Sequence, residues 1–282
     1  MEDALTILVR RLEPLYGKGE ARAIAFVVLE DAFGLSRTDI YAGKGSQFSE
    51  HASRRLLNMC ERLEAGEPVQ YVVGTAPFSG RSFQVEPGVL IPRPETEMLA
   101  DWAKGLRPCG AVLDAGTGSG CLAVTLALDC PACTVTACDV SARALAVAAE
   151  NAARYEAHVR LVEADMLQAL PLPAGGGGYG LIVSNPPYVC ESEREGMEAN
   201  VLGHEPDLAL FVPDDDPLRF YRALARHAMS GALERGGWLL TEVNRAYAAD
   251  TASLYERTGL SHVEVRLDQF GLPRMVGAQR PL

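Results

Sequence analysis

The residues best suited to chemistry form the run Asn185-Pro186-Pro187-Tyr188, which follows an apolar segment. Because two consecutive prolines restrict the backbone, Asn185 and the carbonyl of Pro186 are held in fixed positions. A planar –NH2 group has two N–H donors, and the side-chain oxygen of Asn185 and the Pro186 carbonyl are matching acceptors. The ring of Tyr188 is suited to stacking on such a group. The run predicts a site for an amide or aromatic amine, with Asn185, Pro186 and Tyr188 as catalytic residues and Pro187 as a further substrate contact, although Asn-Pro is also a common turn pair.

A glycine-rich run, Asp114 to Gly120, lies earlier in the chain between a predicted strand and a predicted helix. Glycines let the backbone turn tightly and approach a ligand closely. Asp139 ends the next predicted strand, 23 residues after Gly116, where a carboxylate accepts hydrogen bonds from ribose hydroxyls. Asp165 follows the third strand and is suited to the amino group of adenine. The predicted cofactor-binding residues are Asp114, Gly116, Thr117, Gly118, Ser119, Gly120, Asp139, Asp165 and Asn185.

The same run indicates which cofactor the site takes. Its glycines have the spacing G-x-G-x-G, whereas a dinucleotide loop has G-x-G-x-x-G. Asp114 comes directly before the loop, and its charge would repel a pyrophosphate but tolerate a sulfonium cation. We therefore expect S-adenosylmethionine. In-line transfer of its methyl group to a nitrogen depends mostly on positioning and electrostatics rather than on a strong base.

The elements that must position these residues alternate between strand and helix, which is typical of a mostly parallel sheet covered on both faces. The expected strands are 111–115, 134–139, 159–163, 179–184, 236–243, 261–267 and 273–278, and the expected helices include 95–102, 121–128, 142–154, 216–233 and 246–258. In such a sheet, ligands bind at the carboxyl ends of the strands. The fold class is thus α/β, and residues 93–282 form the catalytic domain.

The first 70 residues have a different pattern. Leucines recur every three or four residues from Leu5 to Leu15, which predicts a helix, and the run 17–19 breaks it. Ser36 and Ser49 are expected to cap later helices. Residues 1–70 thus read as a helical bundle. Residues 71–92 read as a β-hairpin connector, with extended runs expected at 69–73, 82–85 and 89–91.

Composition limits the class of protein. The chain has 282 residues, 48% hydrophobic and 22% charged, and a net charge of −11, which disfavours nucleic acid as a direct partner. The seven cysteines are scattered in apolar segments, and Cys130 and Cys133 lack the second pair that a zinc site needs, so no metal is expected. The acidic start and the absence of a long apolar run predict neither a signal peptide nor a membrane span. We expect a cytoplasmic protein.

With these motifs in place, the chain resembles the release factor glutamine methyltransferases over nearly its whole length. The resemblance rests on Pro68-Val69-Gln70-Tyr71, the run from Leu90 to Glu97, the glycine loop, the Asn185–Tyr188 run and Glu205-Pro206-Asp207-Leu208-Ala209-Leu210. The Asn-Pro-Pro-Tyr motif is shared with DNA adenine and rRNA guanine methyltransferases. The Ile-Pro-Arg-Pro-Glu-Thr-Glu run joined to a helical N-terminal domain is more specific.

The resemblance implies a Rossmann-like class I S-adenosylmethionine-dependent methyltransferase domain that acts in translation termination. The implied substrate is the glutamine of the Gly-Gly-Gln motif in class I peptide chain release factors, held by Asn185 to Tyr188. The resemblance implies that Met166 packs near the adenine. It implies that Arg93 and Glu95 either shape the entrance of the site or form a salt bridge that links the domains. The 205–210 segment is implied either to fold over the site or to be only a packing loop. The N-terminal bundle is expected to recognise the substrate or to be structural, and the enzyme to be a monomer.

Three alternatives remain open from the sequence. A sister enzyme would methylate a ribosomal-protein glutamine. A nucleic-acid amine methyltransferase would act on adenine N6 or guanine N2, which the net charge disfavours. A non-catalytic protein would keep the cofactor only as a regulatory ligand, against which the intact Asn185 and Tyr188 argue.

Overall fold

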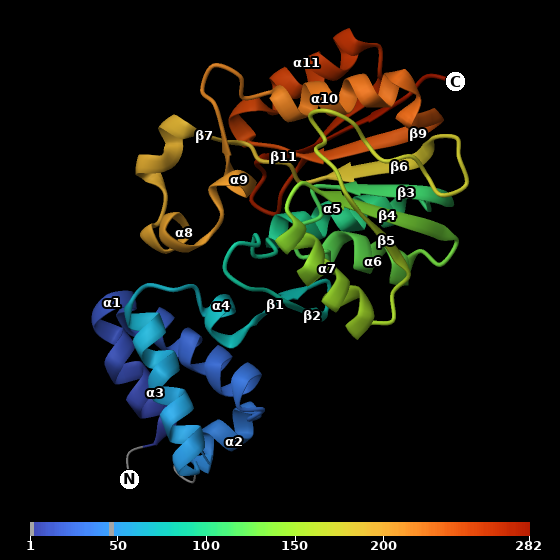
Figure 1. The fold of residues 1–282 in the computed structure, drawn as a ribbon. Coiled ribbons are helices and arrows are strands. Elements are labelled where there is room, and N and C mark those ends of the chain that lie inside the picture. Colours follow the sequence, from blue (N-terminus) through green and yellow to red (C-terminus); the bar gives the residue numbers. More distant parts are fainter. Residues whose placement is uncertain (1–2, 45–47) are drawn as a thin grey trace. The chain divides into compact units, whose positions relative to one another are not determined.

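The computed structural model describes residues 3–44 and 48–282, and the chain divides into two compact units. The helical unit comprises Met1–Thr75, Val85–Pro87 and Glu198–His204, and the sheet unit comprises Ala76–Gln84, Gly88–Met197 and Glu205–Leu282. Met1 and Glu2, the first residues of the segment predicted not to be a signal peptide, lie outside the described residues. Figure 1 shows the elements of both units.

The helical unit is built around a small apolar core. Helix α1, Ala4–Val27, is kinked at Gly17, where φ is 71°, and continues as a π-helical turn, Val28–Ala32. The break expected at residues 17–19 is therefore confirmed as a kink between two helical halves. Leu8, Leu12 and later apolar residues of α1 pack against α3, Glu50–Glu64.

Both serine caps predicted for this unit are confirmed. Ser36 precedes helix α2, Arg37–Tyr41, and exchanges hydrogen bonds with Asp39 in a capping box. The Ser49 hydroxyl accepts a hydrogen bond from the amide of Ala52 at the start of α3. These bonds satisfy first-turn amides that have no partner inside the helix.

Two of the extended runs predicted near the connector are wrong. Val69–Val73 is helix α4, because Pro68 precedes its first turn and helical spacing brings Val69, Val72 and Val73 together on the apolar core of the helical unit. Residues 89–91 form no strand, because they lie between Pro87 and Pro92, which lack the amide donors that a strand needs.

The hairpin consists instead of β1, Thr75–Phe78, and β2, Arg81–Gln84. The run predicted at 82–85 is confirmed as its second strand. The rings of Phe78 and Phe83 are fully buried and meet edge to face with centroids 6.0 Å apart. The Tyr155 hydroxyl bonds to both the amide and the carbonyl of Ser82, each at 2.8 Å, which ties the second strand of the hairpin to the rest of the sheet unit.

A seven-stranded sheet forms the centre of the sheet unit, in the order β10-β11-β9-β6-β3-β4-β5. The neighbours β9, β6, β3, β4 and β5 run parallel, whereas β11 is antiparallel to both β9 and β10, so the mostly parallel prediction is confirmed. The strand bounds are β3 Gly110–Ala115, β4 Cys133–Asp139, β5 Val159–Glu163, β6 Tyr179–Ser184, β9 Leu233–Glu242, β10 Ser261–Leu267 and β11 Pro273–Gln279.

Helices cover both faces of this sheet, as Figure 1 shows. Successive strand residues alternate between two apolar cores: Val112 packs with helices α5, α6 and α7, and Leu113 packs with α10 and α11. The helix bounds are α5 Pro94–Gly105, α6 Cys121–Asp129, α7 Ala142–Arg154, α10 Arg219–His227 and α11 Ala248–Thr258.

The long helix predicted at 216–233 is only partly correct. Helix α10 ends at His227 and is followed by a π-helical turn, Ala228–Ala232, in which Gly231 has a φ of 111°. Leu233 already belongs to β9 and is fully buried. The glycine ends the helical run early because it adopts a conformation outside the right-handed helix.

The segment between β6 and α10 contains short elements that periodicity did not predict. They are β7 Val189–Cys190, a 3-10 turn Glu191–Gly196, α8 Ala199–His204, α9 Asp207–Leu210 and β8 Phe211–Val212. Strands β7 and β8 pair in parallel. Across residues 3–44 and 48–282, no helix has the length and apolarity needed to span a membrane.

Candidate active site

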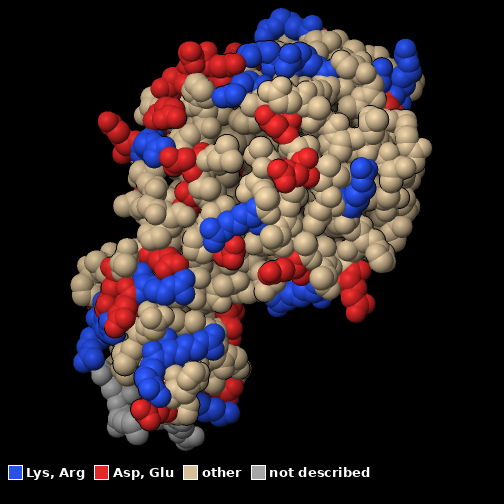
Figure 2. All heavy atoms as spheres, in the orientation of Figure 1, with Lys and Arg blue, Asp and Glu red and all other residues tan. Residues whose placement is uncertain are grey.

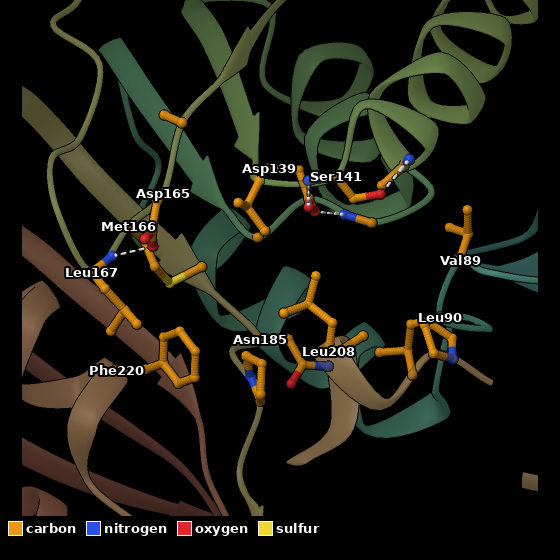
Figure 3. A pocket seen from close by; sticks show the side chains of 18 of the residues that line it. Val89, Leu90, Asp139, Ser141, Asp165, Met166, Leu167, Asn185, Leu208 and Phe220 are labelled. Carbon is orange, nitrogen blue, oxygen red and sulfur yellow. Dashed lines mark hydrogen bonds between the residues drawn. The ribbon is translucent and has the colours of Figure 1, made fainter. Parts of the chain in front are cut away.

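The larger of two adjoining cavities has a volume of about 250 Å³ and opens at the carboxyl ends of four adjacent parallel strands. Gly116 follows β3, Asp139 ends β4, Asp165 follows β5 and Asn185 follows β6, and all four line the cavity. Figure 3 shows Asp139, Asp165 and Asn185 arranged around this space. Parallel pairing explains the convergence, since the carboxyl ends of adjacent strands meet at one edge of the sheet.

The glycine loop has a backbone that only glycine adopts without strain. Gly116, Gly118 and Gly120 have φ values of 78°, 54° and 79°. A Cβ added to Gly116 would lie 2.7 Å from the Met166 methyl carbon, and one added to Gly120 would lie 2.9 Å from the Cβ of Ala148. Gly120 is therefore also required by the closeness of Ala148, whereas the neighbour of Gly116 is the end of a flexible side chain.

Asp139 joins the glycine loop to the end of β4. One carboxylate oxygen accepts a hydrogen bond from the Gly118 amide and the other from the Ser141 amide, both at 2.9 Å. Burial raises the pKa of this carboxyl. Asp165 has a similar local bond, because its carboxylate accepts from the Leu167 amide at 2.8 Å. Each acid thus has a fixed orientation beside the cavity.

Asp114 lies deeper, where it supports the loop. Its carboxylate accepts a hydrogen bond from the Thr117 hydroxyl at 2.7 Å and one from the Ala123 amide in the first turn of α6 at 3.2 Å. Burial is the main cause that raises the pKa of Asp114, to about 7. Asp114, Thr117 and Ser119 line a smaller cavity of about 40 Å³ rather than the larger one. Gly120 lines neither cavity and begins α6 as its N-cap.

The two cavities share Leu90, Gly116, Gly118 and Asn185. Asn185 therefore lies where the larger cavity meets the smaller one. Its side-chain nitrogen donates a hydrogen bond to the Thr96 hydroxyl at 2.9 Å. Its side-chain oxygen accepts no hydrogen bond from any side chain or amide within residues 3–44 and 48–282.

The other residues of the Asn185–Tyr188 run have distinct surroundings. Pro187 lines the larger cavity, whereas Pro186 is buried and does not line that cavity. Tyr188 lines a separate cavity of about 540 Å³, and its hydroxyl donates a hydrogen bond to Glu242 at 3.0 Å. The structure thus places Asn185 and Pro187 beside the glycine loop and Tyr188 behind them.

Arg93 and the 205–210 segment, which sequence reasoning left open, are in contact. The Arg93 guanidinium pairs with the Glu205 carboxylate at 2.5 Å, and Glu205 also accepts a hydrogen bond from the Ile91 amide at 3.2 Å. The Glu205 side chain is 1% exposed. Next to it, Pro206, Leu208 and Ala209 line the larger cavity. The segment thus forms part of the cavity wall.

Sequence reasoning missed several residues that shape the site. Thr96 and Glu242 were read only as parts of a helix and a strand, yet both contact the Asn185–Tyr188 run. Asn151 of α7 joins the loop to the hairpin, because its side chain bonds to the Ser119 carbonyl and to both backbone groups of Gln84. A carboxyl at the end of an apolar strand was the available signal for Glu242.

The lining of the larger cavity fits S-adenosylmethionine. It contains two acids, Asp139 and Asp165, and no lysine, arginine or histidine among the described lining residues. Figure 3 shows apolar side chains around the same space, with Met166 and Phe220 on one side and Val89 and Leu90 on the other. Carboxylates suit ribose hydroxyls and a cationic sulfonium, whereas a pyrophosphate would be repelled. Within the described residues no group of three or more His, Cys, Asp or Glu side chains could hold a metal ion.

Two family models match the chain. The PrmC N-terminal domain matches residues 3–74, and the methyltransferase small domain matches residues 96–202. A crystal structure of a methyltransferase from Pyrococcus furiosus superimposes with a TM-score of 0.52 at 18% identity, covering 83% of this chain and 100% of that one. This likeness shows the fold of a class I methyltransferase.

Relatives of known name match over nearly their full lengths. The release factor glutamine methyltransferase of Bacteroides thetaiotaomicron is 43% identical over 98% of this chain and 99% of its own. That of Flavobacterium psychrophilum is 34% identical, covering 96% of both chains. The protein is thus an S-adenosylmethionine-dependent methyltransferase that belongs to the release factor glutamine methyltransferase family.

Proposed function

We propose that the protein transfers the methyl group of S-adenosylmethionine to the side-chain N5 of the glutamine in the Gly-Gly-Gln motif of class I peptide chain release factors. The names of its relatives support the substrate. The observation that carries the chemistry is the free side-chain oxygen of Asn185, at the junction of the two cavities. That oxygen is the acceptor that a substrate –NH2 group needs.

Asn185 and Pro186 hold the substrate nitrogen in this proposal. The two amide hydrogens bond to the Asn185 oxygen and the Pro186 carbonyl, which turns the face of the nitrogen toward the cofactor. When bound, S-adenosylmethionine would supply an electrophilic methyl group, whose sulfur–carbon bond would break as the nitrogen–carbon bond forms, with S-adenosylhomocysteine as the leaving group. Because the methylated nitrogen is acidic, it loses its proton to water or a backbone acceptor, and no strong base is needed. Pro187 lines the same cavity and contacts the flat group in this proposal, whereas Tyr188 supports the run from the neighbouring cavity through its bond to Glu242.

The predicted cofactor residues divide by their contacts. Asp139 is suited to the ribose hydroxyls and Asp165 to the adenine amino group, and the Met166 side chain packs beside them. Gly116 and Gly118 let the backbone approach the ligand, and Asp114, Thr117, Ser119 and Gly120 hold the loop in shape.

The division of labour along the chain is also a proposal. Residues 1–70 are proposed to recognise the release factor, residues 71–92 to link the two domains, and residues 93–282 to catalyse the methyl transfer. The enzyme is proposed to be a cytoplasmic monomer. On the face that Figure 2 shows, basic and acidic side chains are interspersed on both units. Such a surface favours a folded protein over a phosphate backbone as partner.

An activity assay tests the substrate. The protein is incubated with labelled S-adenosylmethionine and an unmodified release factor, and the labelled residue is located by mass spectrometry. Label on the Gly-Gly-Gln glutamine supports the proposal. Label only on a ribosomal-protein glutamine, or only on DNA or rRNA, would replace it with the corresponding alternative.

Replacing Asn185 tests the chemistry. Asn185→Ala should reduce turnover at least about a hundredfold, because it removes one preorganised polar contact to the reacting group. Cofactor affinity, measured by calorimetry, should be nearly unchanged, since the glycine loop and its acids remain. Unchanged turnover would refute the role of Asn185.

A further inference from the structure

A buried chain of hydrogen bonds leads away from Asn185. Its side-chain nitrogen donates to the Thr96 hydroxyl at 2.9 Å, and the Thr96 hydroxyl donates to one oxygen of Glu242 at 2.7 Å. The Tyr188 hydroxyl donates to the other oxygen of Glu242 at 3.0 Å. Glu242 is fully buried and Thr96 is 4% exposed, so water does not compete for these bonds.

While Glu242 is ionised, the donor and the acceptor of each of these hydrogen bonds can be assigned in only one way. A carboxylate only accepts hydrogen bonds, so the hydroxyls of Thr96 and Tyr188 must both donate to it. The single hydrogen of the Thr96 hydroxyl is then used, and its oxygen must accept from Asn185. The Asn185 amide therefore presents its –NH2 to Thr96, which leaves its carbonyl oxygen for the substrate.

We propose that Glu242 and Thr96 are positioning residues that fix the polarity of Asn185, so that the site accepts an amide –NH2 group and rejects a carboxylate. This inference rests on the proposed function and adds a source of its specificity. Glutamine and glutamate side chains have nearly the same shape, so the site must distinguish a donor from an acceptor. An Asn185 oxygen facing the cavity bonds to the amide and repels the carboxylate, whereas a reversed Asn185 would favour the carboxylate.

The surroundings of Glu242 make its charge state responsive to pH. Thr96 and Glu95 face it from α5, Tyr188 from the segment after β6, Tyr221 from α10 and Arg274 from β11. Burial is the largest cause that raises the pKa of Glu242, to about 7, and Glu95 raises it further, whereas the hydroxyl bonds and Arg274 lower it. A protonated Glu242 can itself donate a hydrogen bond, and the direction of the chain is then no longer fixed.

Three substitutions separate polarity from packing. Thr96→Val keeps the shape and removes the hydroxyl, Thr96→Ser keeps the hydroxyl, and Glu242→Gln keeps the shape but adds a donor. Thr125→Val is the matched control, because Thr125 is also buried and its hydroxyl has no hydrogen-bond partner within residues 3–44 and 48–282. We expect Thr96→Val and Glu242→Gln to lower kcat on a release factor roughly ten- to a hundredfold with much smaller changes in KM, and Thr96→Ser to restore most of it.

The pH profile supplies a readout that packing alone would not move. In the wild-type enzyme kcat should rise with pH through a midpoint near 7 as Glu242 ionises. Glu242→Gln should lack this transition. The proposal is refuted if Thr96→Val behaves like Thr125→Val, if Thr96→Ser is as impaired as Thr96→Val, or if Glu242→Gln keeps the wild-type pH profile.

A measurement without substrate keeps the two proposals separate. The side-chain –NH2 signals of Asn185 are identified in nitrogen-15 NMR spectra by their absence from Asn185→Ala. They should show slow hydrogen exchange, shift with a midpoint near pH 7, and lose both properties in Thr96→Val but not in Thr125→Val. If no release factor is methylated but these signals behave as expected, the proposed positioning of Asn185 by Thr96 and Glu242 stands and the substrate proposal fails. If the signals do not change when Thr96 or Glu242 is replaced, the proposed positioning role of these residues is refuted, whatever the substrate.

Discussion

Three glycines of the loop after β3 have the same left-handed backbone, yet a methyl group added to each would meet different neighbours. At Gly118 an added Cβ has nothing within 4 Å. At Gly120 it would lie 2.9 Å from the Cβ and 3.1 Å from the Cα of Ala148, which a side-chain rotation cannot move. At Gly116 it would lie 2.7 Å from the end of the flexible Met166 side chain. Alanine at the three positions therefore separates backbone strain from steric overlap.

The expected losses of stability follow from these contacts. A left-handed conformation costs a non-glycine residue about 1–2 kcal/mol, so Gly118→Ala should lose roughly that amount. Gly120→Ala adds an overlap with the α7 backbone worth about 1–3 kcal/mol, for a total of about 2–5 kcal/mol. Gly116→Ala should resemble Gly118→Ala in stability, because the Met166 methyl group can rotate away.

Gly116→Ala should differ in ligand binding. Met166 lines the larger cavity, so a displaced Met166 side chain alters the space available to the cofactor. Affinity for S-adenosylmethionine should fall, and the double variant Gly116→Ala/Met166→Ala should recover part of it. Binding is measured by calorimetry with each variant.

Urea unfolding followed by tryptophan fluorescence measures the stabilities. Trp102 and Trp238, the two tryptophans of the chain, both belong to the sheet unit, so the signal reports on the unit that carries the loop. Equal losses for Gly118→Ala and Gly120→Ala would refute the steric argument. A loss in Gly116→Ala as large as that in Gly120→Ala would show that Met166 cannot move.

Two further predictions concern the buried polar groups around the loop. Asn151→Ala removes three hydrogen bonds, of 2.7, 3.0 and 2.8 Å, from a fully buried side chain. The free energy of unfolding should fall by about 2–4 kcal/mol in the same urea assay. A decrease below about 1 kcal/mol would contradict the role of Asn151 in holding the loop and the hairpin together. Asp114 has a folded pKa of about 7, above the value of an unfolded chain, so the folded protein binds its proton more tightly and stability falls as pH rises toward 7. Asp114→Asn should reduce this slope, by at most about 1.4 kcal/mol per pH unit, in unfolding curves measured between about pH 5 and 8; an unchanged slope would contradict the assignment.

The sequence by itself determined the central sheet. Apolar runs such as 134–139 and 179–184 are typical of strands covered on both faces, and their alternation with helices 121–128 and 142–154 predicts that they run parallel, as they do. Motifs at the ends of these strands then had to meet at one edge. The glycine loop, Asp139 and Asn185 were found in this way, because each stands at a fixed offset from a strand.

Local periodicity was less informative where short segments depend on distant partners. Val69–Val73 has a sequence suited to a strand, but it packs as a helix because the apolar core of the helical unit accepts its helical face. The elements between β6 and α10 are two to six residues long, too short for a period to be read.

The contacts between motifs were decided only by the tertiary structure. Thr96, Asn185 and Glu242 stand far apart in the chain, and no spacing rule joins them, yet α5, β6 and β9 bring their side chains within hydrogen-bond distance. The same holds for Arg93 and Glu205. A sequence specifies which groups are polar and where each element ends. Which donor meets which acceptor depends on how the elements pack, because a buried hydrogen bond is fixed by three-dimensional proximity and by the exclusion of water.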